Sequence, residues 1–505
     1  MLAEPRSGPK KEFELTSLVM AHGSKPHRHR SSSAPATTKP TRFDMGPPKT
    51  VRTISQDAFN EMVKENIEDL GMDPTEALED AVQTLCLQGV DLSGIVQCVP
   101  GESSVSDNPV IQALTRLKEL GSDSSDNEKE VVELLGNLND LCSSKGSENA
   151  AIAAKNGGLE LVISILPKLQ KNGAHPESLR SALNTLASLI SDLQSTEIFR
   201  ESGGPKIVAG ILDESQDVNI LNSGFSVVAG AASGNEVVKD SFMNLKIDQL
   251  IIKIMKENDG RNFPSLYDAI RILLTADDNR VVASQVYGYA RTFAKLGIVE
   301  TLVHTLNEGL SSPCVVSASI ALKAVAVNDE ICRSVADNGG IDAILQCIDD
   351  CGEQGSKAMA RTCCSLLSKL AGSDLNKSLI IEKGGMRRLI KLAARFSEDP
   401  SVLQEIMSHI SILCLRSPDN AARAIEAGAG DLAIQAMQRF SESEQLQRNA
   451  CLMIRNLVVR NAENRTILLG HGIEKLIRKA KGSHKICKDA ATDALRDLGV
   501  DNYNS

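Results

Sequence analysis

The side chains best suited to chemistry in this 505-residue chain are its 12 cysteines and eight histidines. Cys347 and Cys351 lie one helical turn apart, a spacing that could supply half of a metal site, and Cys363 and Cys364 are adjacent. A structural zinc site needs four ligands at recognisable spacing, and neither a CxxC pair nor a group of histidines completes this set. The pattern therefore predicts buried, reduced thiols in a reducing compartment, and no bound metal.

The motifs of common enzyme classes are missing from the sequence. It contains no Walker loop, no GxGxxG after a strand, no HExxH and no GxSxG. The histidines have no recurring acidic or cysteine partner, and His409 is expected to be a hydrogen-bonded structural residue rather than a catalytic base. These observations predict a protein that is not an enzyme and needs no cofactor.

Composition narrows the class of protein further. Aromatic residues make up only 3% of the chain, with no Trp, so the core must be aliphatic, as in helix-on-helix packing. The net charge is −10, and the acidic body argues against binding to nucleic-acid phosphates. No apolar run approaches the about 18 residues of a membrane span, and no signal peptide is evident. We therefore expect a soluble cytosolic protein, with the nucleus left open as a second compartment.

The chain divides by composition into four regions that must position any functional residues. Residues 1–50 hold seven of the 17 prolines with Ser, Thr and basic residues, which predicts a disordered tail. Residues 51–99 are predicted to form a small helical region. Residues 100–129 are predicted to be a flexible linker with a short helix, and residues 130–500 a single repeat domain.

The small helical region is predicted from its capping residues. Ser55 can cap a helix that starts at the next residue, and Asp73-Pro74 can begin a second helix with proline in its first turn. A third short segment follows at 92–99. The spacing therefore predicts two or three short helices.

From about residue 130 the sequence repeats a glycine-containing turn followed by an apolar helix. Four intervals between the first glycines of these turns measure 44–46 residues, and a divergent unit lies near Asn244. Another apolar helix and a short Asn-containing loop precede most of the turns. A helical repeat of this length predicts an α-solenoid of the armadillo or HEAT type. The marking glycines are Gly157, Gly203, Gly297, Gly339, Gly384, Gly428 and Gly472.

The glycine turn, the Asn loop and the period together resemble armadillo repeats over about residues 130–499. The segments ISQDAFNEMVKENIED, QGVDLSGIV, ACLMIRNLV and ALRDLG resemble the armadillo repeat-containing protein 6 family, as does the insertion DDNRV. The resemblance implies an all-α, right-handed armadillo superhelix of about eight repeats with a small helical N-terminal region. It also implies a protein-interaction scaffold without catalytic residues or cofactor.

The resemblance further implies a concave groove lined by the third helix of each repeat. Importin-like members hold peptides there with Trp and Asn ladders, but here only Asn456 fits and every Trp is missing, which disfavours an import receptor. Tyr267, Arg271 and Lys323 instead predict a mildly basic patch with one aromatic anchor, suited to an acidic or C-terminal peptide. Ser368 and Asn456 extend this candidate surface, and ordinary solvated residues are the alternative. The aligned pairs are Tyr267 with Arg271, Ser319 with Lys323, Cys364 with Ser368, Ser408 with Ile412, and Leu452 with Asn456.

A second candidate surface is an insertion at residues 277–294, in the third full repeat. Insertions in solenoids map to loops on one face, often the binding face. The alternative is a longer helix that packs Val286, Tyr289 and Phe293 onto the stack. The candidate binding residues are Asp277, Asp278, Arg280 and Tyr287.

These patterns predict a non-enzymatic scaffold or adaptor that binds partners through the groove and the insertion. A nucleocytoplasmic transport adaptor and a regulatory subunit of an enzyme complex are the alternatives. The expected partners are proteins, rather than nucleic acids or membranes, and the chain is expected to be a monomer.

Overall fold

The computed structural model describes most of the chain from Arg52 onwards. The predicted tail at 1–50 and the segment 121–127 of the predicted linker lie outside the described residues. Within the described part, no single helix is long and apolar enough to cross a membrane. The described ranges are 52–120, 128–144, 148–171, 176–258, 263–277 and 283–504.

The described residues form 28 α-helices, most of which follow one another in triads. Eight triads run from α5 to α28, and α3 with α4 forms a partial triad before them. The first helices are α5 (Asn149–Lys155), α8 (Leu193–Glu201), α11 (Glu236–Asn244), α14 (Ala283–Lys295), α17 (Asp329–Asp337), α20 (Asp374–Glu382), α23 (Pro418–Ala427) and α26 (Ala462–Gly470).

The second helices form one row and the third helices another. The second helices are α3 (Pro109–Leu120), α6 (Gly158–Lys171), α9 (Gly204–Glu214), α12 (Ile247–Glu257), α15 (Ile298–Asn307), α18 (Gly340–Gln354), α21 (Gly385–Arg395), α24 (Ala429–Arg439) and α27 (Ile473–Ser483). The third helices are α4 (Glu128–Ser143), α7 (Pro176–Leu189), α10 (Val218–Ala232), α13 (Pro264–Leu273), α16 (Val315–Val325), α19 (Lys357–Leu370), α22 (Pro400–Cys414), α25 (Glu444–Val458) and α28 (Lys488–Asp497). Short 3₁₀ turns lie at Gly309–Ser311 and Lys485–Cys487.

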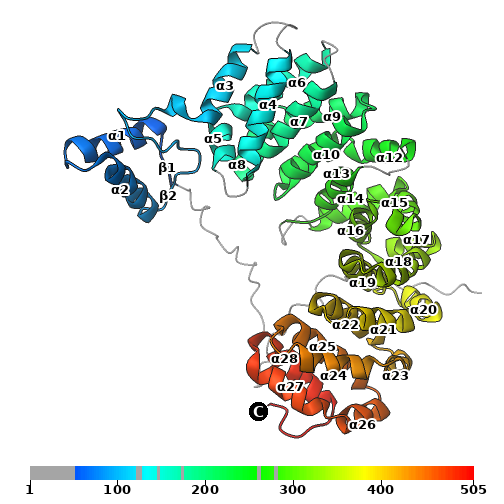
Figure 1. The fold of residues 1–505 in the computed structure, drawn as a ribbon. Coiled ribbons are helices and arrows are strands. Elements are labelled where there is room, and N and C mark those ends of the chain that lie inside the picture. Colours follow the sequence, from blue (N-terminus) through cyan, green and yellow to red (C-terminus); the bar gives the residue numbers. More distant parts are fainter. Residues whose placement is uncertain are drawn as a thin grey trace, which may run out of the picture.

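Each third helix packs on the third helix of the next triad, from α4 on α7 to α25 on α28. Figure 1 shows α16, α19, α22 and α25 along the inner side of a curved molecule, with α15 and α21 farther out. We call the third helices the inner row and the second helices the outer row. One continuous core of mostly aliphatic side chains runs from Val96 to Leu498. The predicted all-α armadillo solenoid of about eight repeats is confirmed.

The glycine pair between the first and second helices has a steric cause at each position. Gly339 has φ 82°, in the left-handed region, where a residue with a side chain is strained. A Cβ added to Gly340 would lie 2.5 Å from the Val335 Cγ1 atom of the preceding helix. In the divergent unit, Lys246 takes the left-handed position with φ 62°. The repeated turn is therefore required by the backbone and by the close approach of two helices.

The asparagines of the loops close the ends of the third helices. The Asn376 amide donates to the carbonyl oxygens of Leu370, at 3.2 Å, and Cys332, at 2.8 Å. The Asn464 amide likewise donates to the Leu457 carbonyl oxygen at 2.8 Å. Leu370 and Leu457 lie in the last turns of α19 and α25, so these amides add hydrogen bonds to carbonyl groups at helix ends, and Asn376 also ties two triads together.

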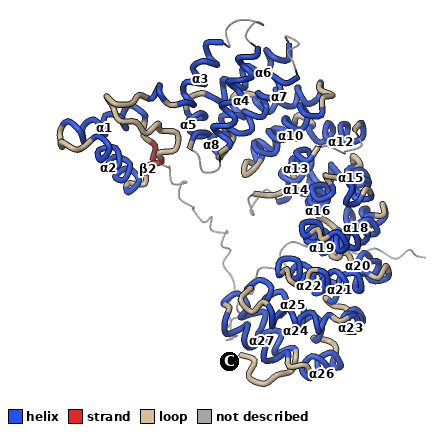
Figure 2. Tube along the Cα trace, in the orientation of Figure 1, coloured by secondary structure: helices blue, strands red, loops and turns tan. Residues whose placement is uncertain are grey.

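A small lobe with its own core precedes the solenoid (Figure 2). Ser55 Oγ accepts from the Ala58 amide at 3.2 Å, and Asp73 accepts from the Thr75 amide at 3.0 Å, so both predicted caps are present. The two short strands pair in parallel. The elements of the lobe are β1 (Arg52–Thr53), α1 (Gln56–Glu68), α2 (Pro74–Leu87) and β2 (Val90–Asp91).

The third segment at 92–99 contains no helix, which corrects the upper limit of three short helices. Its backbone lies against α5, where a Cβ on Gly94 would collide with Lys155. The Lys155 ammonium donates to Asp91 Oδ2 at 3.3 Å and to Ser93 Oγ at 3.2 Å. This contact joins the lobe to the solenoid. The segment is thus held by hydrogen bonds to α5 and not by those of a helix of its own.

The packing of the solenoid begins earlier than the predicted boundary at residue 130. Val110 and Leu117 of α3 are fully buried in the main core, and α3 packs on α4, α5 and α6. The partial triad has the 3₁₀ turn Val105–Asp107 before its second helix. Because a complete glycine turn does not precede α3, the sequence pattern assigned it to the linker.

The predicted insertion contains a lengthened first helix. Helix α14 has 13 residues, whereas α11 and α17 have nine each. Val286 and Phe293 are buried on the stack and Tyr289 is half-buried, as the longer-helix alternative requires. The Tyr289 hydroxyl and the Gln285 amide both donate to Asp240, and the latter distance is 2.6 Å. Part of the predicted insertion therefore packs in the core of the solenoid.

Candidate binding surface on the inner helix row

The predicted aromatic anchor Tyr267 is not on the surface, which corrects its assigned role. It is 1% exposed, and its hydroxyl is 3.1 Å from Thr305 Oγ1 on the outer row. Burial raises the pKa of its hydroxyl to about 12. The sequence alignment placed Tyr267 on the groove side of α13, but this position of the helix faces the core.

Arg271 and Lys323 both lie at the inner row. Arg271 is partly exposed and makes an ion pair with Asp268 of its own helix, with 3.4 Å between Nε and Oδ1. Lys323 is exposed, and its ammonium donates to Ser365 Oγ at 2.6 Å. Each residue occupies the last turn of its third helix, where a cation is favourable next to the helix dipole.

Ser368 and Asn456 hold neighbouring inner-row helices together. Ser368 Oγ donates to the Cys364 carbonyl at 2.8 Å and lies 3.2 Å from His409 Nδ1. The Asn456 amide donates to Ser411, at 3.0 Å to the carbonyl and 2.8 Å to the hydroxyl. These contacts give both residues a structural role.

Asp277 of the predicted insertion site also has a structural role. It pairs with the ammonium of Lys239, which is completely buried and lies 3.1 Å from Glu236 Oε1. Lys239 additionally donates to the Thr275 carbonyl at 2.6 Å. Asp278 and Arg280 lie outside the described residues.

Tyr287 and Lys323 come from the two predicted surfaces and line one hollow. Its volume is about 260 Å³, and Lys369 of α19 borders it with them. The walls are mostly aliphatic and come from α14, α16 and the end of α13: Leu274, Val286, Ala324 and Val327. We call this site the inner hollow.

Two ammonium groups border the inner hollow. Among the described residues, neither Lys323 nor Lys369 has a carboxylate partner. Lys369 was missed from the sequence, although it follows Lys323 by one repeat length and occupies the last turn of the next third helix. Ile320, one turn before Lys323, adds an aliphatic side chain that is 37% exposed.

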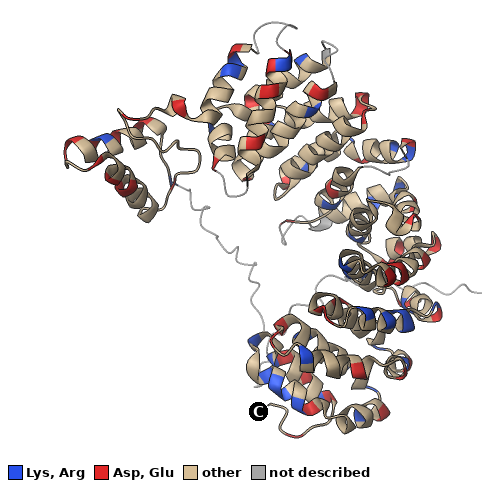
Figure 3. Cartoon of the chain, in the orientation of Figure 1, with Lys and Arg blue, Asp and Glu red and all other residues tan. Residues whose placement is uncertain are grey.

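Some charges on the outer row are paired between repeats. Figure 3 shows acidic residues on α18 beside basic residues on α21. Lys383 pairs with Asp342 at 2.7 Å, and Arg388 pairs with Asp349. The outer row thus satisfies many of its own charges, in contrast with the inner hollow.

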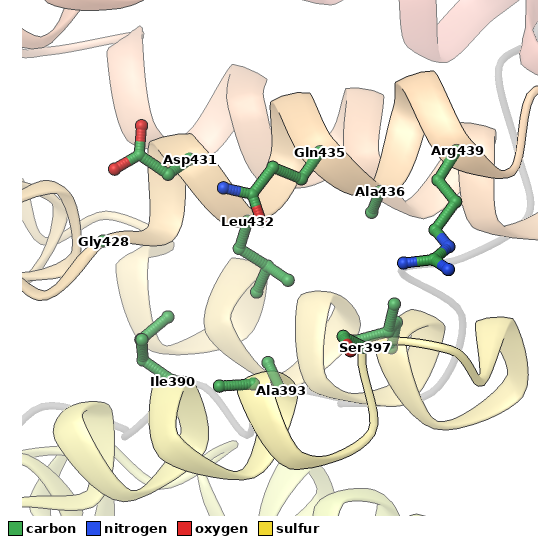
Figure 4. A pocket seen from close by; sticks show the side chains of 11 residues that line it. Ile390, Ala393, Ser397, Gly428, Asp431, Leu432, Gln435, Ala436 and Arg439 are labelled. Carbon is green, nitrogen blue, oxygen red and sulfur yellow. The ribbon is translucent and has the colours of Figure 1, made fainter.

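The outer row has a hollow of similar size between α21 and α24. Its volume is about 270 Å³. Figure 4 shows Asp431, Gln435 and Arg439 of α24 along one side of it, above Ile390 and Ala393 of α21. Arg439 pairs with Glu398, so the charge at that end is neutralised within the chain. We call this site the outer hollow.

The thiols pack in the core, as predicted. Eleven of the 12 cysteines are buried. Cys347 and Cys363 share a hydrogen bond, which together with burial raises the pKa of Cys363, and burial raises the pKa of Cys351 to about 12. Across the described ranges, no group of three His, Cys, Asp or Glu side chains is placed to hold a metal ion.

His409 is completely buried on α22. Its Nδ1 atom is within hydrogen-bond distance of Ser368 Oγ, and its Nε2 atom has no partner. Burial lowers the pKa of the imidazole to about 3, so the ring is neutral at physiological pH. This environment matches the predicted structural histidine.

Comparison with a known structure supports the fold class. An engineered protein of known crystal structure superposes with a TM-score of 0.57 at 18% identity, over 85% of this chain and 99% of that one. At this identity the likeness shows the shared fold alone.

Two sequence-family models match this chain and identify its family. A family model described as ARMC6 matches residues 110–503, and one described as the armadillo repeat-containing protein 6 N-terminal domain matches residues 51–129. The chain therefore belongs to the armadillo repeat-containing protein 6 family.

Individual relatives agree with this family. The chain is 29% identical to armadillo repeat-containing protein 6 of Homo sapiens and also of Pongo abelii, in each case over 73% of this chain and 75% of the relative. It is 24% identical to the Drosophila melanogaster homolog over 75% of this chain and 80% of the relative.

Proposed function

We propose that this protein is a non-enzymatic scaffold that binds partner polypeptides along its inner row, with the inner hollow as an anchor. Stacked helical repeats create extended concave surfaces that proteins of this architecture use for binding. The observation that carries the proposal is the pair of ammonium groups of Lys323 and Lys369 beside an aliphatic hollow, neither of which has a carboxylate partner among the described residues.

Helix capping explains part of this arrangement but not all of it. A cation in the last turn of a helix contributes about 0.3–1 kcal/mol, which accounts for basic residues at the ends of α13, α16 and α19. It does not account for an open hollow with Tyr287 and aliphatic walls between two of these cations. Arg271 belongs to the same basic side, because it lies one helical turn before Thr275, which lines the hollow.

Site-specific photo-crosslinking in cells tests this function. A photo-reactive residue in place of Ile320 is expected to capture partner polypeptides, whereas the same residue in place of the exposed outer-row Arg395 is not. Introducing Arg271→Glu with Lys323→Glu is expected to remove the crosslinks at position 320. Equal capture from both rows, or no capture at position 320, would contradict the proposal.

A further inference from the structure

The inner hollow combines positive charge with apolar walls, and both features restrict the chemistry of a ligand. Lys323 and Lys369 border a space of about 260 Å³ that is also lined by Leu274, Val286 and Val327. The volume suits one or two side chains rather than a folded domain. A ligand must therefore present a negative charge and an aliphatic group close together.

We propose that the inner hollow binds an extended acidic segment of a partner protein through an internal Glu or Asp next to an aliphatic residue. This inference rests on the proposed function and names the chemistry of the ligand. The ligand carboxylate lies between Lys323 and Lys369, where charge-assisted hydrogen bonds replace the water around the ammonium groups. The neighbouring aliphatic side chain enters the hollow beside Tyr287.

Charge complementarity favours a carboxylate over a neutral or basic group at this position. Lys323 is already oriented by its 2.6 Å hydrogen bond to Ser365, which leaves two of its three ammonium protons for a ligand. Lys369 is half-buried on the next helix, so part of its solvation is already lost. The exposed Ile320 on the same helix as Lys323 offers a surface along which a ligand chain can continue, so we assign an internal acidic residue and not a chain terminus.

The experiment uses the full-length chain and synthetic peptides of defined sequence. The probe is a fluorescein-labelled, C-terminally amidated ten-residue peptide with a central Glu-Leu pair flanked by Gly and Ser. Matched peptides carry Gln-Leu, Glu-Ser or Lys-Leu, and a further peptide ends at a free carboxylate after Leu. We expect affinity for Glu-Leu to exceed that for Gln-Leu and Glu-Ser by about fivefold each, in keeping with partly exposed charge pairs and one buried aliphatic side chain.

Variants of the protein locate the binding. Lys323→Met with Lys369→Met is expected to reduce the affinity for the Glu-Leu peptide about tenfold, because both charge contacts are lost. Val327→Glu is expected to abolish it by placing a carboxylate in the hollow. Arg395→Met on the outer row is the matched control and is expected to leave affinity unchanged. Thermal melting followed by circular dichroism checks that each variant is folded.

Three results would overturn the proposal: equal binding of Glu-Leu and Gln-Leu, binding that survives the double lysine substitution, or binding only to the free carboxylate. None of these three results contradicts the scaffold function if crosslinking at position 320 still captures partners. Loss of that crosslinking with retained peptide selectivity would instead contradict the scaffold function. The two proposals therefore fail separately.

Discussion

The stretch of the outer row formed by α18 and α21 and the inner hollow differ in whether their basic side chains pair with carboxylates. On the outer row, α18 and α21 neutralise part of each other's charge through the pairs of Arg388 with Asp349 and Lys391 with Glu353, the second at 3.7 Å. On the inner row, Lys323 and Lys369 have no carboxylate partner among the described residues. A charge that its own chain compensates has less to gain from a ligand, so the difference favours the inner hollow as the proposed partner site.

The two hollows show that size alone does not distinguish a binding site. The inner and outer hollows measure about 260 and 270 Å³. Arg439 at the outer hollow pairs with Glu398, whereas the inner hollow retains two ammonium groups for a ligand. If compensated and uncompensated charges respond alike to substitution, this distinction between the two hollows is wrong.

The largest expected effect is on a buried compensated charge. Asp277→Ala leaves the completely buried Lys239 with a single carboxylate, Glu236, and is expected to lower the free energy of unfolding by about 3 kcal/mol. Lys369→Met, which removes an uncompensated charge, is expected to change it by less than about 0.5 kcal/mol. Urea denaturation measures both, and equal losses would remove the distinction.

The next effect concerns the neutral histidine of the inner row. His409 has a pKa of about 3 in the folded state and an ordinary value near 6.5 when unfolded. The unfolded state therefore binds the proton more strongly, and stability is lost as the pH falls below about 6.5. Between pH 7.5 and 5.0 this residue is expected to cost about 2 kcal/mol.

Urea denaturation of the chain and of His409→Leu at both pH values isolates this contribution. We expect the variant to lose about 2 kcal/mol less than the unmodified chain over the same interval. An identical pH dependence in the two proteins would show that the imidazole is not buried as a neutral group.

The two tyrosines near the inner row provide a smaller contrast. Tyr267→Phe removes a buried hydroxyl that interacts with Thr305 and is expected to cost about 1 kcal/mol. Tyr287→Phe alters a half-buried residue of the hollow and is expected to have almost no effect on stability. Thermal denaturation of the two variants side by side tests this assignment, and the reverse order would refute it.

The smallest expected effect is on an exposed outer pair. The Arg439 and Glu398 side chains are 53% and 68% exposed, and exposed pairs contribute little to stability. Arg439→Ala is expected to change the free energy of unfolding by less than about 0.5 kcal/mol and to leave Glu-Leu peptide binding unchanged. A clear loss of peptide binding would extend the ligand site to the outer row.

Much of the fold could be predicted because each repeat records the same local constraint. A left-handed glycine, such as Gly339, recurs at seven of the eight described junctions between a first and a second helix, and Lys246 takes that position at the eighth. The first triad was harder to recognise because α3 has no such turn before it. Similarly, the sequence of residues 92–99 predicts a short helix, whereas in the structure this segment is held in a non-helical form against Lys155.

The candidate site was less predictable than the fold. A shift of one residue on a helix rotates a side chain by about 100°, which is enough to move Tyr267 from the surface to the core. The sequence predicts that Asp277 is a free surface carboxylate, because its partner Lys239 is distant in the chain and comes next to it only in the folded structure. The role of Lys369 emerges only when adjacent triads are stacked.

By itself, the sequence determines the repeat, the aliphatic core and the positions of the glycine turns, because these depend on contacts between near neighbours in the chain. Tertiary structure decides which charges remain uncompensated and which side chains border a hollow. Lys323, Lys369 and Tyr287 lie on three helices and meet only through the stacking of triads. Binding surfaces of a solenoid are formed between repeats, whereas its sequence pattern is set within each repeat.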